Sequence, residues 1–132
     1  MARKITRKGL ERKLDKLIRE IVFLRDASCV TCPIWKEIKP EFVGSPIMQP
    51  GHYFTRGALS VKWDLRNVYK QCKTCNFLHQ YHREILAKHV LDTLGEKGFK
   101  QLILDAHKTR RWVMPELQEL YKELYNEFLS GY

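Results

Sequence analysis

Four cysteines arranged as two C-x-x-C pairs are the feature that most restricts how this chain can fold. The first pair is Cys29 and Cys32, the second is Cys72 and Cys75, and residues 33–71 separate them. Each pair can form a tight turn that directs both sulfurs to one point, so the four thiolates can surround one Zn²⁺ tetrahedrally. Four protein ligands leave no position for water, and we therefore expect a structural zinc. Unrelated buried cysteines and a redox-active dithiol are the alternatives.

Lys and Arg exceed Asp and Glu strongly in this chain. The formal net charge is +9 at pH 7, which favours a polyphosphate partner through the release of its counterions. We therefore predict DNA as the partner. The residues expected to contact it are Arg3, Lys4, Arg7, Lys8, Arg12 and Lys70. A basic helix that only aids solubility is the alternative for the N-terminal segment.

The sequence contains no pattern typical of membrane insertion or export. No segment approaches the roughly 18 consecutive apolar residues of a membrane span, and no apolar block of signal-peptide type follows the charged N-terminus. We expect a cytoplasmic protein with no membrane partner.

Hydrophobic periodicity predicts helices at both ends of the chain and a short β-region between them. Leucines and isoleucines at three-to-four-residue spacing predict a basic amphipathic helix from Lys8 to near Asp26. Four prolines over residues 27–57 predict loops, turns and short strands. Strands are expected around 48–54 and 67–71, followed by one helix over 73–94. Further helices are expected around 99–106, after a stop at Gly95, and from Pro115 onward.

These elements make an α+β fold of a size usual for one domain. We predict a single domain over residues 1–132. It would consist of the basic helix over 1–26, a zinc-stapled core over 27–94 and a helical scaffold over 95–132. Tyr53, Phe54, Trp63 and Tyr69 are expected to pack in its core rather than to stack on unpaired bases.

Residues suited to phosphodiester hydrolysis stand between and directly after the cysteine pairs. His52 follows Gly51, and Asn76 follows Cys75. A general base needs a pKa near the working pH, which imidazole supplies, and a divalent cation offsets the charge that builds on the phosphate. We expect His52 and Asn76 to divide these two tasks.

Three ordered motifs resemble the phage NinG (Rap) recombination proteins and, more broadly, the His-Me finger or HNH nucleases. They are Cys29-Val30-Thr31-Cys32, Gly51-His52-Tyr53-Phe54-Thr55-Arg56-Gly57-Ala58 and Asn67-Val68-Tyr69-Lys70-Gln71-Cys72-Lys73-Thr74-Cys75-Asn76. The resemblance covers roughly residues 26 to 80. It implies a ββα-metal core and a metal-dependent DNA endonuclease acting on branched intermediates such as Holliday junctions or D-loops in a phage recombination system.

The same resemblance implies roles for individual residues. His52 would be the general base, Asn67 the residue that orients it, and Asn76 the ligand of a catalytic Mg²⁺ or Mn²⁺. Helical spacing, and not the resemblance, places His79 or Gln80 about one turn after Asn76, where either could help to hold the cation, and we favour His79. Arg56 would clamp a phosphate, with a structural salt bridge as its alternative. The protein would work in the bacterial host cytoplasm, and a homodimer would suit symmetric junction cleavage.

The chain departs from the family pattern beside the base. Gly51 stands where many HNH enzymes carry an Asp cation ligand, Gln49 is the nearest polar residue upstream, and Tyr69 stands where relatives commonly carry His. One alternative is therefore a noncatalytic four-cysteine zinc module that binds DNA or a recombination protein. The other is a general or sequence-specific HNH endonuclease.

Overall fold

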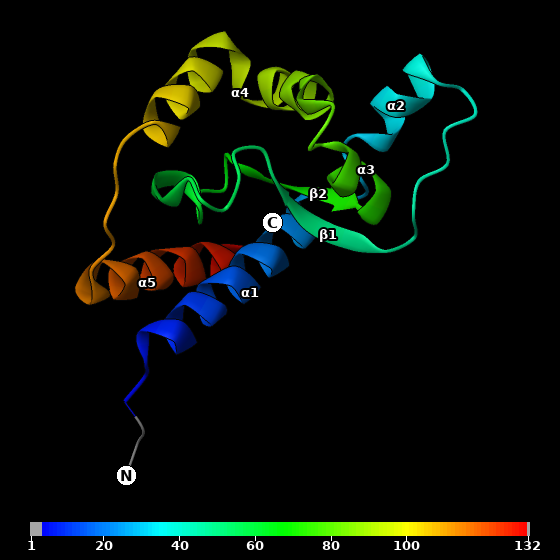
Figure 1. The fold of residues 1–132 in the computed structure, drawn as a ribbon. Helices are drawn as coiled ribbons and strands as arrows, with labels where there is room; N and C mark the ends of the chain where they lie inside the picture. Colours follow the sequence, from blue (N-terminus) through cyan, green and yellow to red (C-terminus); the bar gives the residue numbers. More distant parts are fainter. Residues whose placement is uncertain (1–3, 132) are drawn as a thin grey trace.

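A small two-stranded sheet lies between helices in the computed structural model, which describes residues 4–131 (Figure 1). The mixed α+β class predicted above is confirmed. In chain order the elements are α1 (Arg7–Arg25), α2 (Cys32–Ile38), β1 (Met48–His52), a 3-10 turn η1 (Leu59–Val61), β2 (Val68–Cys72), α3 (Lys73–Leu78), α4 (Arg83–Ala106) and α5 (Met114–Ser130). Arg3, one of the expected DNA contacts, lies outside the described residues.

The predicted N-terminal helix is confirmed as α1. It begins after Thr6, whose hydroxyl oxygen accepts a hydrogen bond from the amide of Gly9 at 3.0 Å and so satisfies one free N–H of the first turn. The apolar side chains of α1 pack against α5, which runs beside it (Figure 1). The buried members of this first core are Leu10, Leu14, Leu17, Ile18, Ile21, Val22, Trp63, Val68, Leu117 and Leu124.

The antiparallel pairing of β1 with β2 gives the hairpin two different faces. His52 pairs with Val68, whereas the neighbouring Gly51 pairs with Tyr69. Because side chains alternate along a strand, Val68 points into the core shared with α1, and Tyr69 points into a second core. That second core contains Val61, Tyr69, Leu86, Val90 and Leu102 and is covered by α4. The hairpin therefore separates two apolar layers.

The single helix predicted over residues 73–94 is wrong, because the chain turns at residues 79–82 between α3 and α4. Cys75 fixes α3 to the cysteine cluster, whereas Leu86 fixes α4 to Tyr69, so the two helices are held at different places. The stop predicted at Gly95 corresponds to a break in α4, where φ is 75° and the backbone leaves helical geometry. Glycine adopts this conformation without a Cβ penalty.

Two elements were missing from the sequence prediction. Helix α2 lies in the segment expected to be irregular, and η1 lies between the strands. Pro33 at the first turn of α2 is the local signal for that helix, but none of its residues is buried and its apolar pattern is weak. Of the predicted core aromatics, Trp63 and Tyr69 are buried, and Tyr53 and Phe54 pack against the second core. Within residues 4–131, no helix combines the length and apolarity needed to cross a membrane.

Candidate metal centre and active site

The four cysteines meet at the end of the hairpin, as their spacing predicted. All four Sγ atoms lie within 4.8 Å of one another. The Sγ of Cys32 is 3.6 Å from that of Cys72 and 3.7 Å from that of Cys75. Zinc–thiolate bonds of about 2.3 Å at tetrahedral angles place sulfurs roughly 3.8 Å apart, so this set fits one Zn²⁺. The protein therefore has a four-cysteine site that can bind a metal such as zinc.

Thiols packed this closely do not all ionise by themselves. The Cys75 thiol donates to Cys29 and lowers the pKa of Cys29 to about 4. Burial, together with the Cys29 thiolate, raises the pKa of Cys32 to about 12. The pKa of Cys75 is raised as well, first by its hydrogen bond to Cys29 and then by burial. A divalent cation removes this conflict because it stabilises all four thiolates together.

A buried polar link joins the cysteine cluster to the hairpin. The Nε2 of Gln71, on β2, donates to the Thr31 hydroxyl at 3.1 Å, and that hydroxyl lies 3.6 Å from the Sγ of Cys29. Gln71 and Thr31 are almost fully buried. The first knuckle and the second strand are therefore connected by hydrogen bonds as well as by the cysteines.

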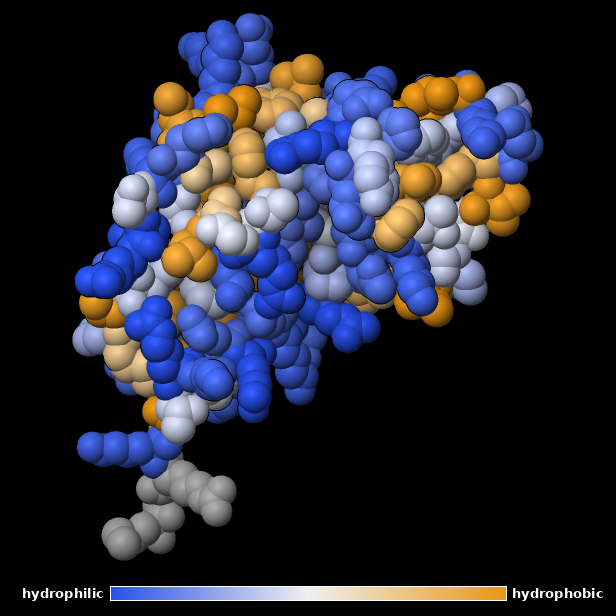
Figure 2. Space-filling view, in the orientation of Figure 1, coloured by the Kyte–Doolittle hydropathy of each residue, from blue (hydrophilic) through white to orange (hydrophobic). Residues whose placement is uncertain are grey.

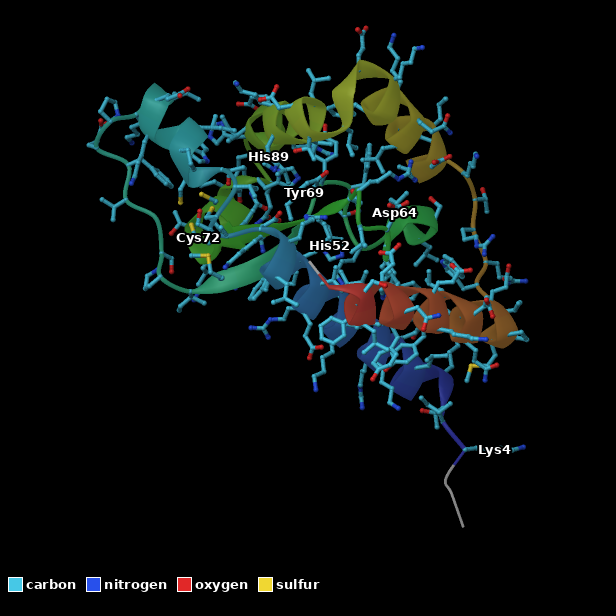
Figure 3. The ribbon with its side chains drawn as sticks, turned by 180° about the vertical axis from the view of Figure 1, so that it is seen from behind. Lys4, His52, Asp64, Tyr69, Cys72 and His89 are labelled. Carbon is cyan, nitrogen blue, oxygen red and sulfur yellow. The ribbon has the colours of Figure 1, made fainter. Side chains whose placement is uncertain are left out.

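His52 ends β1 on the face of the hairpin that meets α1 (Figure 3). Its Nε2 lies 3.1 Å from the carbonyl oxygen of Lys62. A carbonyl has no proton to give, so Nε2 carries the hydrogen and the lone pair is on Nδ1. Burial, and next the positive charge of Arg56, lower the pKa of His52 below 6.5. The imidazole is therefore neutral at neutral pH.

Arg56 lies beside His52 because a carboxylate on α1 holds it there. Its Nη2 is 2.6 Å from the Oδ2 of Asp15, whose Oδ1 accepts from the indole of Trp63 at 2.8 Å. Asp15, His52, Arg56 and Trp63 line a cavity of about 20 Å³, which has room for one water molecule. The Arg56 side chain is 57% exposed, so it retains donors for a second partner. Sequence analysis did not identify Asp15, because it lies on a helix far from the motifs.

Asn67 organises the loop that follows His52. Its Oδ1 accepts from the amide of Phe54 at 2.8 Å, and its Nδ2 donates to the carbonyls of Phe54 at 3.0 Å and Val61 at 3.2 Å. The side chain is fully buried, so these bonds replace all contact with water. Asn67 thus acts on the backbone two residues beyond His52 and not on the imidazole itself.

Asn76, on α3, contacts the hairpin through Gln49 of β1. Its Nδ2 donates to the Oε1 of Gln49 at 2.8 Å, which leaves its Oδ1 as the free acceptor of the amide. Within residues 4–131, no hydrogen bond joins His79 to Asn76. The Nε2 of His79 donates instead to the carbonyl of Tyr53 at 2.9 Å, and burial lowers the pKa of His79. Over the same residues, the four cysteines are the one group of three or more His, Cys, Asp or Glu that could hold a metal.

Gly51 and Gln71 explain why this chain has no side chain before the presumed base. A Cβ placed on Gly51 would lie 2.0 Å from the Oε1 of Gln71. That Oε1 is buried and has no hydrogen-bond partner among the described residues. The Gln71 side chain therefore fills the space that an Asp at position 51 would need.

A protein-family model matches nearly the whole chain. The model described as "Bacteriophage Lambda NinG protein" matches residues 2–129. The chain belongs to the NinG family. No curated protein and no solved structure matches it.

The basic residues of this NinG-family chain differ in exposure and in their contacts with the rest of the protein. Lys8 and Arg12 are exposed along α1, and Lys4 precedes that helix (Figure 3). Arg7 donates to the carbonyl of Trp112 at 2.6 Å, so it helps to join α1 to the start of α5. Lys70 is half-buried, with its Nζ 3.3 Å from the carbonyl of Ala27. The N-terminal residues are therefore better placed than Lys70 to reach a partner.

Proposed function

We propose that this NinG-family protein is a metal-dependent endonuclease that cuts DNA at branched recombination intermediates. The observation that carries the proposal is the state of His52: a neutral imidazole whose Nε2 hydrogen is committed to the Lys62 carbonyl. A base of this kind is ready to take a proton at neutral pH. It ends the first strand of a strand, loop, strand, helix order, in a cavity that also contains Arg56.

The reaction uses His52 and Arg56 in separate roles. The Nδ1 of His52 takes a proton from a water molecule, and the water oxygen forms a bond to phosphorus as the bond from phosphorus to the 3′-oxygen breaks. The 3′-oxygen leaves and takes a proton from solvent, so the products are a 5′-phosphate and a 3′-hydroxyl. Arg56 binds a phosphate oxygen through the donors that Asp15 does not use.

A Mg²⁺ or Mn²⁺ ion, when bound, would offset the negative charge of the phosphate. Asn76 would hold it through Oδ1, the oxygen left free by the bond to Gln49. Such hard cations prefer oxygen ligands and keep several waters, so phosphate oxygens and water would have to supply the rest of the coordination. The help expected from His79 stays a prediction that no contact of its side chain supports.

Binding that does not depend on base sequence follows from the way the protein would grip its substrate. Exposed Lys8 and Arg12 can neutralise phosphates, and such contacts position a protein without reading base sequence. A homodimer would place two His52 sites on the two strands of a symmetric junction. The zinc site would keep the knuckles and the hairpin in register during this contact.

A noncatalytic zinc module that binds DNA is the second candidate. It is favoured by the absence, within residues 4–131, of any cluster of carboxylates or histidines that could hold a second metal. In that case His52 and Asn67 would serve the fold alone.

The deciding experiment is cleavage of a labelled four-way junction and a matched linear duplex with Mg²⁺ or Mn²⁺, with wild type beside His52→Ala. We expect junction-selective cuts whose rate falls by at least about 100-fold in the variant, because the proton acceptor is gone. Zinc content and junction affinity are measured alongside and should not change. Equal cutting of the duplex would indicate a general HNH nuclease, and binding without cutting would support the zinc module.

A further inference from the structure

Two aromatic side chains stand unburied at the end of α3. Phe77 is 57% exposed and Tyr81 is 67% exposed, and their ring centroids are 5.8 Å apart at an interplanar angle of 60°. Trp63 and Tyr69, by contrast, are buried, as expected of core residues. Exposure of these rings to water is unfavourable in free energy, and a planar partner that stacks on them would remove that exposure.

The segment that carries this aromatic pair is held rigidly. Cys75, two residues before Phe77, belongs to the four-cysteine cluster. Beyond Phe77, the side chains of His79 and Arg83 both donate to the carbonyl of Tyr53, at 2.9 and 3.3 Å. The two rings are thus fixed between the cysteine cluster and the hairpin, so they lose little conformational freedom when a partner binds.

The charge around the pair suits a polyanion. Between Asp64 and Glu84 the sequence contains no acidic residue. Arg66 is paired with Asp64 and Asp105, whereas Lys73 and Arg83 stand close to the rings along the chain. Lys73 is exposed one helical turn before Phe77, and Arg83 is exposed two residues after Tyr81. Asn76, the proposed cation ligand, is the immediate neighbour of Phe77.

We propose that Phe77 and Tyr81 form a stacking platform for unpaired bases next to the cleavage site. This inference rests on the proposed function, because it names the DNA feature that the same site recognises: a nucleotide unstacked at a branch or gap. Every base has a π-face, so a platform of two rings flanked by Lys73 and Arg83 binds single-stranded nucleotides without reading sequence. An intact duplex has no exposed base face for the platform, because its bases are stacked on each other.

The test compares DNA with and without unpaired bases in the absence of Mg²⁺ and Mn²⁺, so that no cleavage occurs. The probes are a fluorescein-labelled duplex with a three-nucleotide gap and the same duplex without the gap. The variants are F77L/Y81L, which keeps apolar bulk but removes the rings, and F77W/Y81W, which keeps rings. Leu104→Ala, an exposed apolar position on α4, is the matched control.

We expect F77L/Y81L to bind the gapped duplex at least about tenfold more weakly and the intact duplex within twofold of wild type. F77W/Y81W and the Leu104→Ala control should bind both probes as wild type does. Equal losses on both probes, or no loss on either, would overturn the proposal.

Self-association is the rival use of this end of the molecule. Aliphatic surface gathers over α2 and the loop that leads to β1, where Ile38, Val43 and Ile47 are exposed (Figure 2). Sedimentation of wild type and F77L/Y81L tests it: loss of a dimer in the variant, with gap affinity unchanged, would overturn the stacking platform. The cleavage assay with His52→Ala tests the nuclease function, and gap binding by F77L/Y81L without divalent cations tests the stacking platform. Failure of one proposal can therefore be distinguished from failure of the other.

Discussion

Arg56 connects the basic helix to the proposed general base. Its guanidinium is 2.6 Å from Asp15 on α1, and its charge helps to lower the pKa of His52. The pKa of His52 therefore depends on the position of α1, because Asp15 on α1 holds the Arg56 side chain near the imidazole. If His52 is the base, as proposed, its lowered pKa should place the acid limb of the pH–rate profile below pH 6.5, because the rate would fall when His52 becomes protonated.

Arg56→Gln should move that acid limb to higher pH. The substitution removes a positive charge near the imidazole and releases the Asp15 carboxylate, and both changes favour protonated His52. Cleavage rates at saturating substrate, measured from pH 5 to 8, give the position of the limb. Arg12→Gln, exposed on α1, is the control and should leave the limb unchanged. A limb that stays in place in Arg56→Gln would contradict the electrostatic coupling.

Gly51→Ala should destabilise the protein because the new Cβ would meet the Oε1 of Gln71 at 2.0 Å. We expect the free energy of unfolding to fall by about 1–3 kcal/mol, as for other overpacked sites. Urea denaturation measures it. In the Gly51→Ala/Gln71→Ala double variant the loss should be smaller than the sum of the two single losses, because the collision is gone.

The control for this pair is Gly57→Ala, whose Cβ would lie 3.7 Å from Thr55, an ordinary contact. Its unfolding free energy should stay close to that of wild type. Strictly additive losses at positions 51 and 71 would mean that the two side chains do not compete for one space.

At the scale of elements, α2 and α3 depend on the metal site more than on their own packing. They have seven and six residues, which is too short for a helix to be stable in isolation. No residue of α2 is buried, and Cys75 is the buried residue of α3. We therefore expect metal binding by the four cysteines to supply much of their stability.

Removal of zinc with a chelator should therefore release these two helices first. We expect amide hydrogens of residues 32–38 and 73–78 to exchange much faster, while those of α1, which is packed on α5, change less. Hydrogen exchange followed by mass spectrometry measures both. Added Zn²⁺ should restore the protection and Mg²⁺ should not, because thiolates are soft ligands. Uniform loss of protection in all helices would instead show that the metal holds the whole fold.

Local pattern explains which elements the sequence predicted. Neighbouring residues encode the apolar stripe of α1, the two cysteine knuckles and the two strands. The predicted ends of α1, β1 and β2 differ from the observed ends by two residues or fewer. The turn at 79–82 was missed because it depends on Cys75 and Leu86 being anchored to different partners. The contact of Arg56 with Asp15 crosses 41 positions of the chain, and no local pattern encodes it.

For the molecule as a whole, the excess positive charge should govern affinity more than structure selectivity. Lys8→Ala/Arg12→Ala should reduce the slope of log affinity against log salt by about one to two, because each lost phosphate contact removes nearly one released counterion. The loss should be equal for junction and linear duplex. Fluorescence anisotropy over a series of salt concentrations measures it.

A charge-matched control is Lys97→Ala/Lys100→Ala on α4, where both side chains are exposed and Lys100 already lies 3.4 Å from Glu96. That variant should keep the salt slope of wild type. An equal drop in slope for both pairs would mean that net charge alone matters, and that α1 has no special place in binding.

The pairing of α1 with α5 also determines when a newly made chain can become active. The apolar side of α1 is covered by Leu117 and Leu124, which leave the ribosome after the hairpin and both knuckles have been synthesised. Until then α1 packs only on the hairpin side, through residues such as Trp63 and Val68, so we expect an interrupted translation product to carry the motifs with a less firmly held Asp15–Arg56 contact. If the protein is the nuclease proposed above, full activity would therefore wait for the synthesis of α5.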